Sequence, residues 1–280
     1  MTVDSKRQGF TLIELSIVLV IIGLIVGAIE VGRSLIRQSQ VASIITDIQN
    51  FTSATRQFQQ KYRSLPGDMY NATSYWGASA NCTSAGSLVS GTCNGNGNGR
   101  ISNSGQGTPE SSGPSPSFAI YHGEDVLFWQ HLSLAGMIQG SYAGGNGGAN
   151  GDASVYNTTT APYSHIPNNC YAITYGADDP QGGIMVNAQG ALYYPPGNVF
   201  FLGAATRYGC YTNPTLTPTE AAAIDTKMDD GLPFSGTVIT TAYGFYPGFS
   251  WTPCVTNSTP YTYITTYTNP YCPLIFQPNF

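Results

Sequence analysis

The sequence predicts an α+β protein in which one long N-terminal α-helix packs on an antiparallel β-sheet domain whose loops are braced by disulfides. Three observations support this fold class: an apolar run at residues 10–29, a proline-free helical pattern that continues to residue 65, and short strand-like segments between turn residues beyond it. The expected parts are a leader at 1–9, a membrane-spanning helix at 10–29, its amphipathic continuation at 30–64 and a β-rich globular domain at 65–280.

The apolar run at 10–29 is long enough to cross a bilayer as a helix. It contains no charged residue except Glu14, and ~20 apolar residues span a hydrocarbon core of ~30 Å. Lys6 and Arg7 favour a cytoplasmic amino end, so that the bulk of the chain is translocated. A secretory signal peptide would be cut after its apolar run. Here the sharp boundary lies before the run, at Gly9, and the apolar helix is therefore expected to remain on the mature protein.

Glu14 is the one residue in this run that needs a polar partner. An ionised carboxylate near the centre of a membrane helix costs ~2.5–3.5 kcal/mol on insertion scales. The run contains no cation within helical reach of Glu14, which favours a partner on another molecule. The alternative is a plain single-span anchor.

The segment GFTLIE at residues 9–14, behind its short charged leader, resembles the class III leader of type IV pilins and type II secretion pseudopilins. The resemblance is specific up to about Val31. It implies that a prepilin peptidase cuts between Gly9 and Phe10 and methylates the new amine of Phe10. It also implies that Glu14 pairs with the Phe10 amine of a neighbouring subunit during filament assembly.

The same resemblance implies a pilin-like fold and a structural role. The expected function is that of a subunit of an extracellular type IV pilus-like filament, assembled from an inner-membrane pool after cleavage and methylation. Its partners would be other copies of itself, the prepilin peptidase and the pilus or secretion assembly machinery. The alternatives are a pseudopilin in the periplasmic pseudopilus of a type II secretion system, a minor or tip pilin, and a membrane-anchored adhesin that does not polymerise.

Composition argues against nucleic-acid binding, and the residue patterns argue against catalysis. Charged residues make up 9% of the chain and the net charge is −5. Beyond Arg63 the only basic residues are Arg100, Arg207 and Lys227, so no basic surface for a nucleic-acid backbone is expected. No nucleophile–base or zinc-binding pattern stands out, and His131, on a helix rich in Trp and Leu, is interpreted as a core residue. The chain is therefore not expected to be an enzyme or to need a cofactor.

Six cysteines on the translocated side of the membrane predict disulfides. Six cysteines allow fifteen pairings. The expected set is Cys82–Cys93, Cys170–Cys210 and Cys254–Cys272. A metal site built from cysteines is disfavoured because the sequence contains no C-x-x-C spacing.

An acidic cluster near the end of a predicted helix is a candidate weak calcium site. Asp225, Asp229 and Asp230 offer the carboxylate oxygens that calcium prefers. The alternative is an acidic turn beside Gly231. Residues 94–101 have the spacing of a calcium loop, but asparagines replace its acids, so a turn is expected there instead.

The outer domain is expected to contain two short helices and several strands. Helices are predicted at 124–135 and 220–228, the second with Thr219 as its cap. Strands are predicted from Tyr- and Val-bearing runs bounded by Gly, Pro or Asn at 172–175, 183–186, 191–194, 199–202 and 236–243. These strands are expected to form an antiparallel sheet laid on the long helix.

Overall fold

The computed structural model describes the following residues, to which every structural statement below refers: 11–79, 91–101, 123–144, 158–176, 197–205, 210, 214–240, 254–256, 258–278 and 280. The chain divides into two compact units, residues 1–40 and 41–280. Each unit is described by itself.

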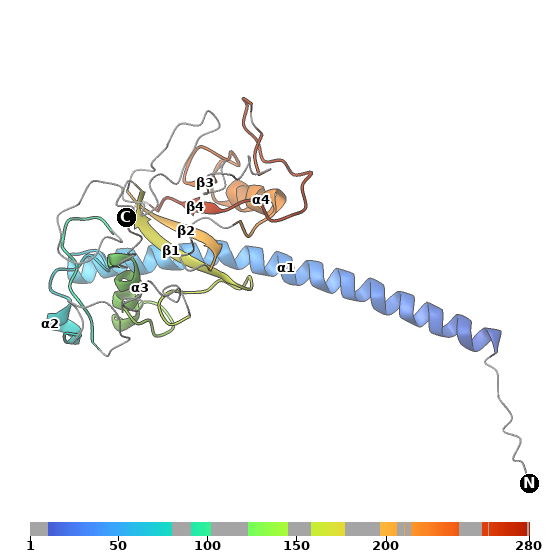
Figure 1. Ribbon diagram of the computed structural model, residues 1–280, viewed down its shortest axis with the longest axis horizontal. Helices are drawn as coiled ribbons and strands as arrows, with labels where there is room; N and C mark the ends of the chain where they lie inside the picture. Colours follow the sequence, from blue (N-terminus) through green and yellow to red (C-terminus); the bar gives the residue numbers. More distant parts are fainter. Residues whose placement is uncertain are drawn as a thin grey trace, which may run out of the picture. The chain divides into compact units, whose positions relative to one another are not determined.

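The long N-terminal helix is α1 (Leu12–Tyr62), drawn in blue in Figure 1. In the first unit its large apolar side chains are all exposed, from 47% at Ile29 to 86% at Leu12. By length and composition this helix could cross a membrane. In the second unit α1 becomes amphipathic, because its buried residues recur every three or four positions: Ile44, Ile48, Phe51, Ala54, Thr55 and Phe58.

Helix α1 ends at Tyr62, two residues before the end that the sequence predicted at residue 64. Arg63 takes a left-handed backbone conformation with φ of 58°, while its N–H still donates to the Gln59 carbonyl at 2.9 Å. A left-handed residue ends the helical hydrogen-bond ladder. The helix therefore stops before Pro66 could interrupt it.

Four strands form one antiparallel sheet: β1 (Asn169–Tyr175), β2 (Asn198–Ala204), β3 (Val238–Thr240) and β4 (Leu274–Phe276). Their order in the sheet is β1-β2-β4-β3. The last strand in the sequence therefore lies inside the sheet, between β2 and β3. The α+β fold class is confirmed.

The strands agree in part with the sequence prediction. Strands β1, β2 and β3 overlap the runs predicted at 172–175, 199–202 and 236–243. Strand β4 was not predicted, because three residues are too few to show an alternating pattern. The runs predicted at 183–186 and 191–194 lie outside the described residues.

The amphipathic part of α1 packs on the sheet through Phe51. The centroid of its ring lies 4.9 Å from that of Trp129, in helix α3 (Glu124–Leu134), and 5.1 Å from that of Tyr171 in β1. The Phe200 ring of β2 follows at 6.1 Å. Aromatic pairs of this kind contribute ~0.5–1.5 kcal/mol each beyond the burial of their area. Phe51 thus joins α1, α3 and the sheet in one core.

The cap of helix α4 (Pro218–Met228) is Thr217, so the prediction of Thr219 as the capping residue was wrong. Thr217 Oγ1 accepts from the Glu220 N–H at 3.3 Å, and Glu220 Oε2 accepts from the Thr217 N–H at 2.9 Å. Pro218 suits the first helical position, where its missing N–H would have no partner in any case. Thr219 instead donates its hydroxyl to the Thr265 carbonyl. Thr217 and Glu220 form the reciprocal capping box that the pattern T-x-x-E encodes.

A short helix, α2 (Thr73–Trp76), was not predicted. Helix α3 was predicted to within one residue. Two disulfides brace the sheet, and both are among the three expected pairs: Cys170–Cys210 and Cys254–Cys272. Cys93 is also disulfide-bonded, whereas Cys82 lies outside the described residues.

Candidate functional site

Glu14 lies in the first turn of α1 and is bound to Thr11, the residue that precedes the helix. Its Oε2 accepts from both the backbone N–H and the hydroxyl of Thr11, each at 2.8 Å. The Glu14 N–H in turn donates to Thr11 Oγ1 at 3.3 Å. These reciprocal bonds are a second capping box, with the same T-x-x-E pattern as α4.

This arrangement satisfies the Glu14 carboxylate within its own chain and holds it at the amino end of the helix. The first N–H groups of a helix have no intrahelical partner, and the helix dipole favours negative charge at that end. Thr11 was not singled out from the sequence. The T-x-x-E signature could have identified it, because the pattern immediately precedes an apolar helical run.

The other residues expected at this site lie just ahead of the described residues. Gly9 and Phe10, the predicted cleavage and methylation residues, are not described. Phe10 is the direct neighbour of Thr11 in the sequence, so an amine at Phe10 would come one residue before the capped turn. The position of Glu14 at this end of α1 is thus compatible with its predicted role, which stays a prediction.

The helix that follows Glu14 has a broad apolar surface without a cover in its own unit. Sixteen large apolar side chains from Leu12 to Ile36 are at least 47% exposed. A soluble monomer rarely carries a continuous apolar surface of this kind, and such surfaces mark sites that contact a membrane or another protein. The first unit therefore combines an apolar helix that suits a nonaqueous environment with one carboxylate at its start.

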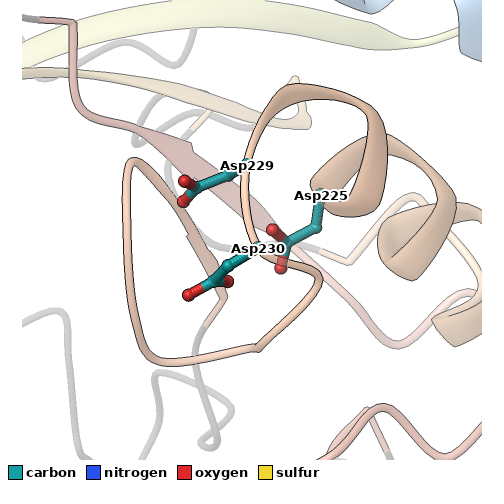
Figure 2. Close-up of side chains that lie close together, drawn as sticks. All are labelled: Asp225, Asp229 and Asp230. Atoms are coloured by element: carbon teal, nitrogen blue, oxygen red, sulfur yellow. The ribbon is translucent and has the colours of Figure 1, made fainter.

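The acidic cluster predicted from the sequence is brought together in space. Asp225, Asp229 and Asp230 each place one carboxylate oxygen within 4.8 Å of the others, and Figure 2 shows their side chains gathered where the chain leaves α4. Calcium binds oxygen ligands at ~2.3–2.6 Å, so oxygens at this spacing can reach a common ion. The donor set and its spacing fit calcium.

The electrostatics of the cluster centre on Asp225, which is fully buried. Burial raises the pKa of Asp225 to about 6, and the charges of Asp230 and Asp229 add to this effect. Hydrogen bonds to its carboxylate from the Tyr263 hydroxyl at 2.8 Å and from the Gly231 N–H at 3.1 Å lower the pKa in part. A carboxylate in this position is easier to protonate than a free aspartate, and a cation beside it would oppose that shift.

The same carboxylates also hold the loop between α4 and β3. Asp229 Oδ2 accepts from the Thr237 N–H and, at 3.1 Å, from the Val238 N–H. Asp230 accepts from the Leu232 N–H at 2.8 Å and from the Ser235 hydroxyl at 2.6 Å. The acidic turn beside Gly231, which was the alternative interpretation, therefore explains part of the cluster without an ion.

His131 of α3 is the packed core residue that the sequence analysis expected, with no exposed surface. Its Nδ1 accepts from the Gly67 N–H at 2.9 Å, and its Nε2 lies 3.0 Å from Thr92 Oγ1 and 3.2 Å from the Cys93 carbonyl. Burial lowers the pKa of His131 to about 4, and the bond to Cys93 offsets this only in part. The imidazole is therefore neutral at pH 7 and connects three segments of the chain.

The comparisons with known proteins bear on the amino-terminal site. The family described as the prokaryotic N-terminal methylation motif matches residues 4–29. This match covers the N-terminal segment and supports a type IV pilin- or pseudopilin-like protein. No curated protein and no solved structure matches it. The matched range contains the leader, Glu14 and most of the apolar surface of α1, which together fit a membrane-anchored precursor that is later assembled into a filament.

Proposed function

We propose that this pilin-like chain is the structural subunit of an extracellular type IV pilus-like filament. The observation that carries the proposal is the methylation motif at residues 4–29, whose only carboxylate beyond the leader, Glu14, lies at the start of an exposed apolar helix. In this proposal the precursor is inserted in the inner membrane, cut after Gly9 and methylated at Phe10. The processed chain then polymerises with copies of itself through the assembly machinery.

The apolar half of α1 supports both stages of this life cycle. Burying one Val, Leu or Ile side chain is worth ~1.5–3 kcal/mol relative to leaving it in water. The exposed side chains from Leu12 to Ile36 therefore favour lipid before assembly. A bundle of the same helices provides the equivalent environment after assembly, so the subunit never has to place this surface in water.

Glu14 supports a defined stagger between neighbouring helices. In the single chain its carboxylate is held by Thr11. In the proposed filament it pairs with the charged amine of Phe10 on a neighbour, in a low-dielectric core. Removing one member of a buried ion pair typically costs ~3–5 kcal/mol, because the other charge is left without compensation. Such a pair disfavours any packing in which the two groups do not meet.

The second unit supports an extracytoplasmic location for the bulk of the chain. Its disulfides, Cys170–Cys210 and Cys254–Cys272, are bonds that persist in oxidising compartments. A translocated domain on a membrane-inserted helix meets this condition on the cell surface and in the periplasm alike. The same features therefore accommodate a type II secretion pseudopilin or a minor pilin, and the experiment has to separate these.

The decisive experiment is electron microscopy of sheared surface material, combined with mass spectrometry of its main protein. Abundant filaments built from this chain, with methylated Phe10 as the first residue, are the expected result. Processed protein confined to membranes and periplasm would replace the proposal with a pseudopilin or minor pilin. An uncut amino terminus in wild-type cells would overturn the proposal, and a variant with a bulky residue in place of Gly9 supplies the uncut reference.

A calcium ion at Asp225, Asp229 and Asp230 stays a prediction alongside this function. The spacing of the three carboxylate oxygens supports it. In the proposed filament such an ion would stabilise the loop between α4 and β3 and would take no part in assembly chemistry.

A further inference from the structure

Residues 94–99 repeat the dipeptide Asn-Gly three times, and the proposed function makes no use of this segment. Asn-Gly is the dipeptide most prone to spontaneous deamidation, because glycine has no side chain to hinder the reaction. The glycine nitrogen attacks the asparagine Cγ, a five-membered succinimide forms, and the side-chain nitrogen leaves as ammonia. Water then opens the ring to aspartate or to isoaspartate. The reaction needs a free glycine N–H and a side-chain amide that can turn towards it.

The fold engages the attacking nitrogen of each dipeptide in a hydrogen bond. The Gly95 N–H donates to the Met69 carbonyl at 2.8 Å, and the Gly97 N–H donates to the Asp68 carbonyl at 2.9 Å. The Gly99 N–H donates to the Asp68 side chain, to Oδ2, at 2.8 Å. A nitrogen whose N–H is engaged in such a hydrogen bond loses its proton less readily, and it must lose that proton to complete the attack on Cγ.

The side-chain amide of each asparagine is also held in place. Asn94 Oδ1 accepts from the Thr73 N–H at 2.9 Å, and Asn98 Oδ1 accepts from the Arg100 N–H at 2.8 Å. Asn96 Oδ1 accepts from the Asn98 N–H at 2.9 Å. Each bond must break before the amide carbon can approach the next nitrogen. In every dipeptide both reacting groups are therefore constrained.

Asp68 makes the largest contribution to this constraint. It is 3% exposed, and its two carboxylate oxygens accept from adjacent N–H groups, Oδ1 from Asn98 at 2.9 Å and Oδ2 from Gly99 at 2.8 Å. Hydrogen bonds to a charged acceptor are about twice as strong as neutral ones. A buried carboxylate thus fixes the conformation of the third dipeptide.

We propose that Asn94, Asn96 and Asn98 are deamidation sites that the fold keeps closed, and that the Asp68 carboxylate closes the site at Asn98. The three sites differ in the group that accepts the hydrogen bond from the glycine N–H. The Gly95 nitrogen is held by the Met69 carbonyl, and the Gly97 nitrogen by the Asp68 carbonyl with an added interaction with its carboxylate. The Gly99 nitrogen is held by the Asp68 side chain alone, which a substitution can remove.

The first dipeptide has an additional constraint in the packing around Gly95. A side chain at this position would collide with the Gly67 carbonyl and the Asp68 backbone, so the two segments pack backbone to backbone. Gly99, in contrast, has open space around it. Loss of the Asp68 carboxylate should therefore affect the Asn98 site and leave the Asn94 site closed.

Deamidation at Asn98 would also remove its own protection. Isoaspartate adds one carbon to the main chain at that residue, which displaces the N–H groups that bind Asp68. An ordinary aspartate would add a second negative charge beside the Asp68 carboxylate, and like charges at this spacing repel. A deamidation event at Asn98 is thus expected to weaken the contacts that the Asp68 carboxylate makes with this segment.

The test is site-resolved peptide mapping of the full chain in detergent after incubation at mildly alkaline pH. Native wild-type protein should deamidate slowly at all three asparagines, and the denatured, reduced protein should show the fast reference rate at each. In Asp68→Ala the rate at Asn98 should rise about ten- to a hundredfold, the range expected for loss of a hydrogen bond to a charged group. Asn94 serves as the internal control in the same molecules, because the Gly95 N–H is held by the Met69 carbonyl.

Two outcomes would overturn the proposal. One is a native wild-type rate at Asn98 equal to the denatured rate, which would show that the site is open. The other is a folded Asp68→Ala protein whose rate at Asn98 does not change. Should Asp68→Ala fail to fold, all three rates would rise together, and Asp68→Asn then decides the matter. That variant keeps one carbonyl acceptor, and the proposal requires it to show a rate at Asn98 between those of native and denatured wild-type protein.

Discussion

Replacing His131 by glutamine should change how the stability of the protein depends on pH. The pKa of His131 is about 4 in the folded state against a usual value of 6.5, because the ring is buried. Between these two values the unfolded chain binds a proton that the folded chain does not. Stability from the neutral ring is therefore complete above pH ~6.5 and is lost as the pH falls towards ~4.

The size of the effect follows from the difference between the two pKa values. One pKa unit corresponds to ~1.36 kcal/mol, so a shift from 6.5 to about 4 is worth about 3 kcal/mol of unfolding free energy. Whole domains are stable by only ~5–15 kcal/mol, which makes this one ring a large contributor to acid sensitivity. A glutamine side chain can accept a hydrogen bond from the Gly67 N–H and donate one to the Cys93 carbonyl, as the imidazole does. Unlike the imidazole, it does not titrate.

The assay is guanidinium unfolding of the full chain in detergent at about pH 7 and about pH 4. It is followed by tryptophan fluorescence, to which the fully buried Trp129 contributes. The unfolding free energy of wild type minus that of His131→Gln should fall by about 3 kcal/mol between the two conditions. Groups common to both proteins cancel in this difference. His165→Gln, which changes an exposed histidine, controls for the loss of a histidine as such. A difference that stays constant with pH would refute the reasoning.

Four further predictions concern the carboxylates and the threonine that caps α1. Asp225→Asn should change the pH dependence of stability in the opposite direction to His131→Gln. The pKa of Asp225 in the folded state is about 6, so between pH ~3.8 and ~6 the folded state holds a proton that the unfolded chain has lost. The unfolding free energy of wild type should therefore fall by about 3 kcal/mol relative to that of the variant as the pH rises through this range. Equal pH profiles of the two proteins would contradict this. Calcium should raise the thermal midpoint of wild type but not of Asp225→Asn, and a titration without any gain in wild type would dismiss the ion. Glu14→Gln should be inserted and cleaved normally yet yield few filaments in the sheared fraction, because an amide cannot pair with a charged amine; wild-type yield would remove the support for the charge pair. Thr11→Ala should destabilise the first turn of α1 by ~1 kcal/mol, while Thr11→Ser should not, as helix content in micelles can report.

The sequence determined the parts of this protein that depend on neighbouring residues. The apolar run, the stripe on α1 and the helix α3 all rest on a helical period of 3.6 residues, and the structure reproduces them with small shifts at their ends. Asp225, Asp229 and Asp230 lie within two helical turns of each other, so their proximity was also readable. Both capping boxes were equally local, at Thr11 and Thr217, and could have been found from T-x-x-E.

Only the tertiary structure decided which distant segments meet. The short strand β4 lies in the sheet between β2 and β3. This position could not be predicted, because the partners of β4 lie far away in the sequence and no local pattern encodes the order of strands in a sheet. The hydrogen bonds from Asn98 and Gly99 to the Asp68 carboxylate join residues about thirty positions apart, and they likewise could not be predicted from the sequence. Local periodicity specifies what each segment is, since it depends on bonded neighbours, whereas the partners of each segment depend on packing across the whole chain.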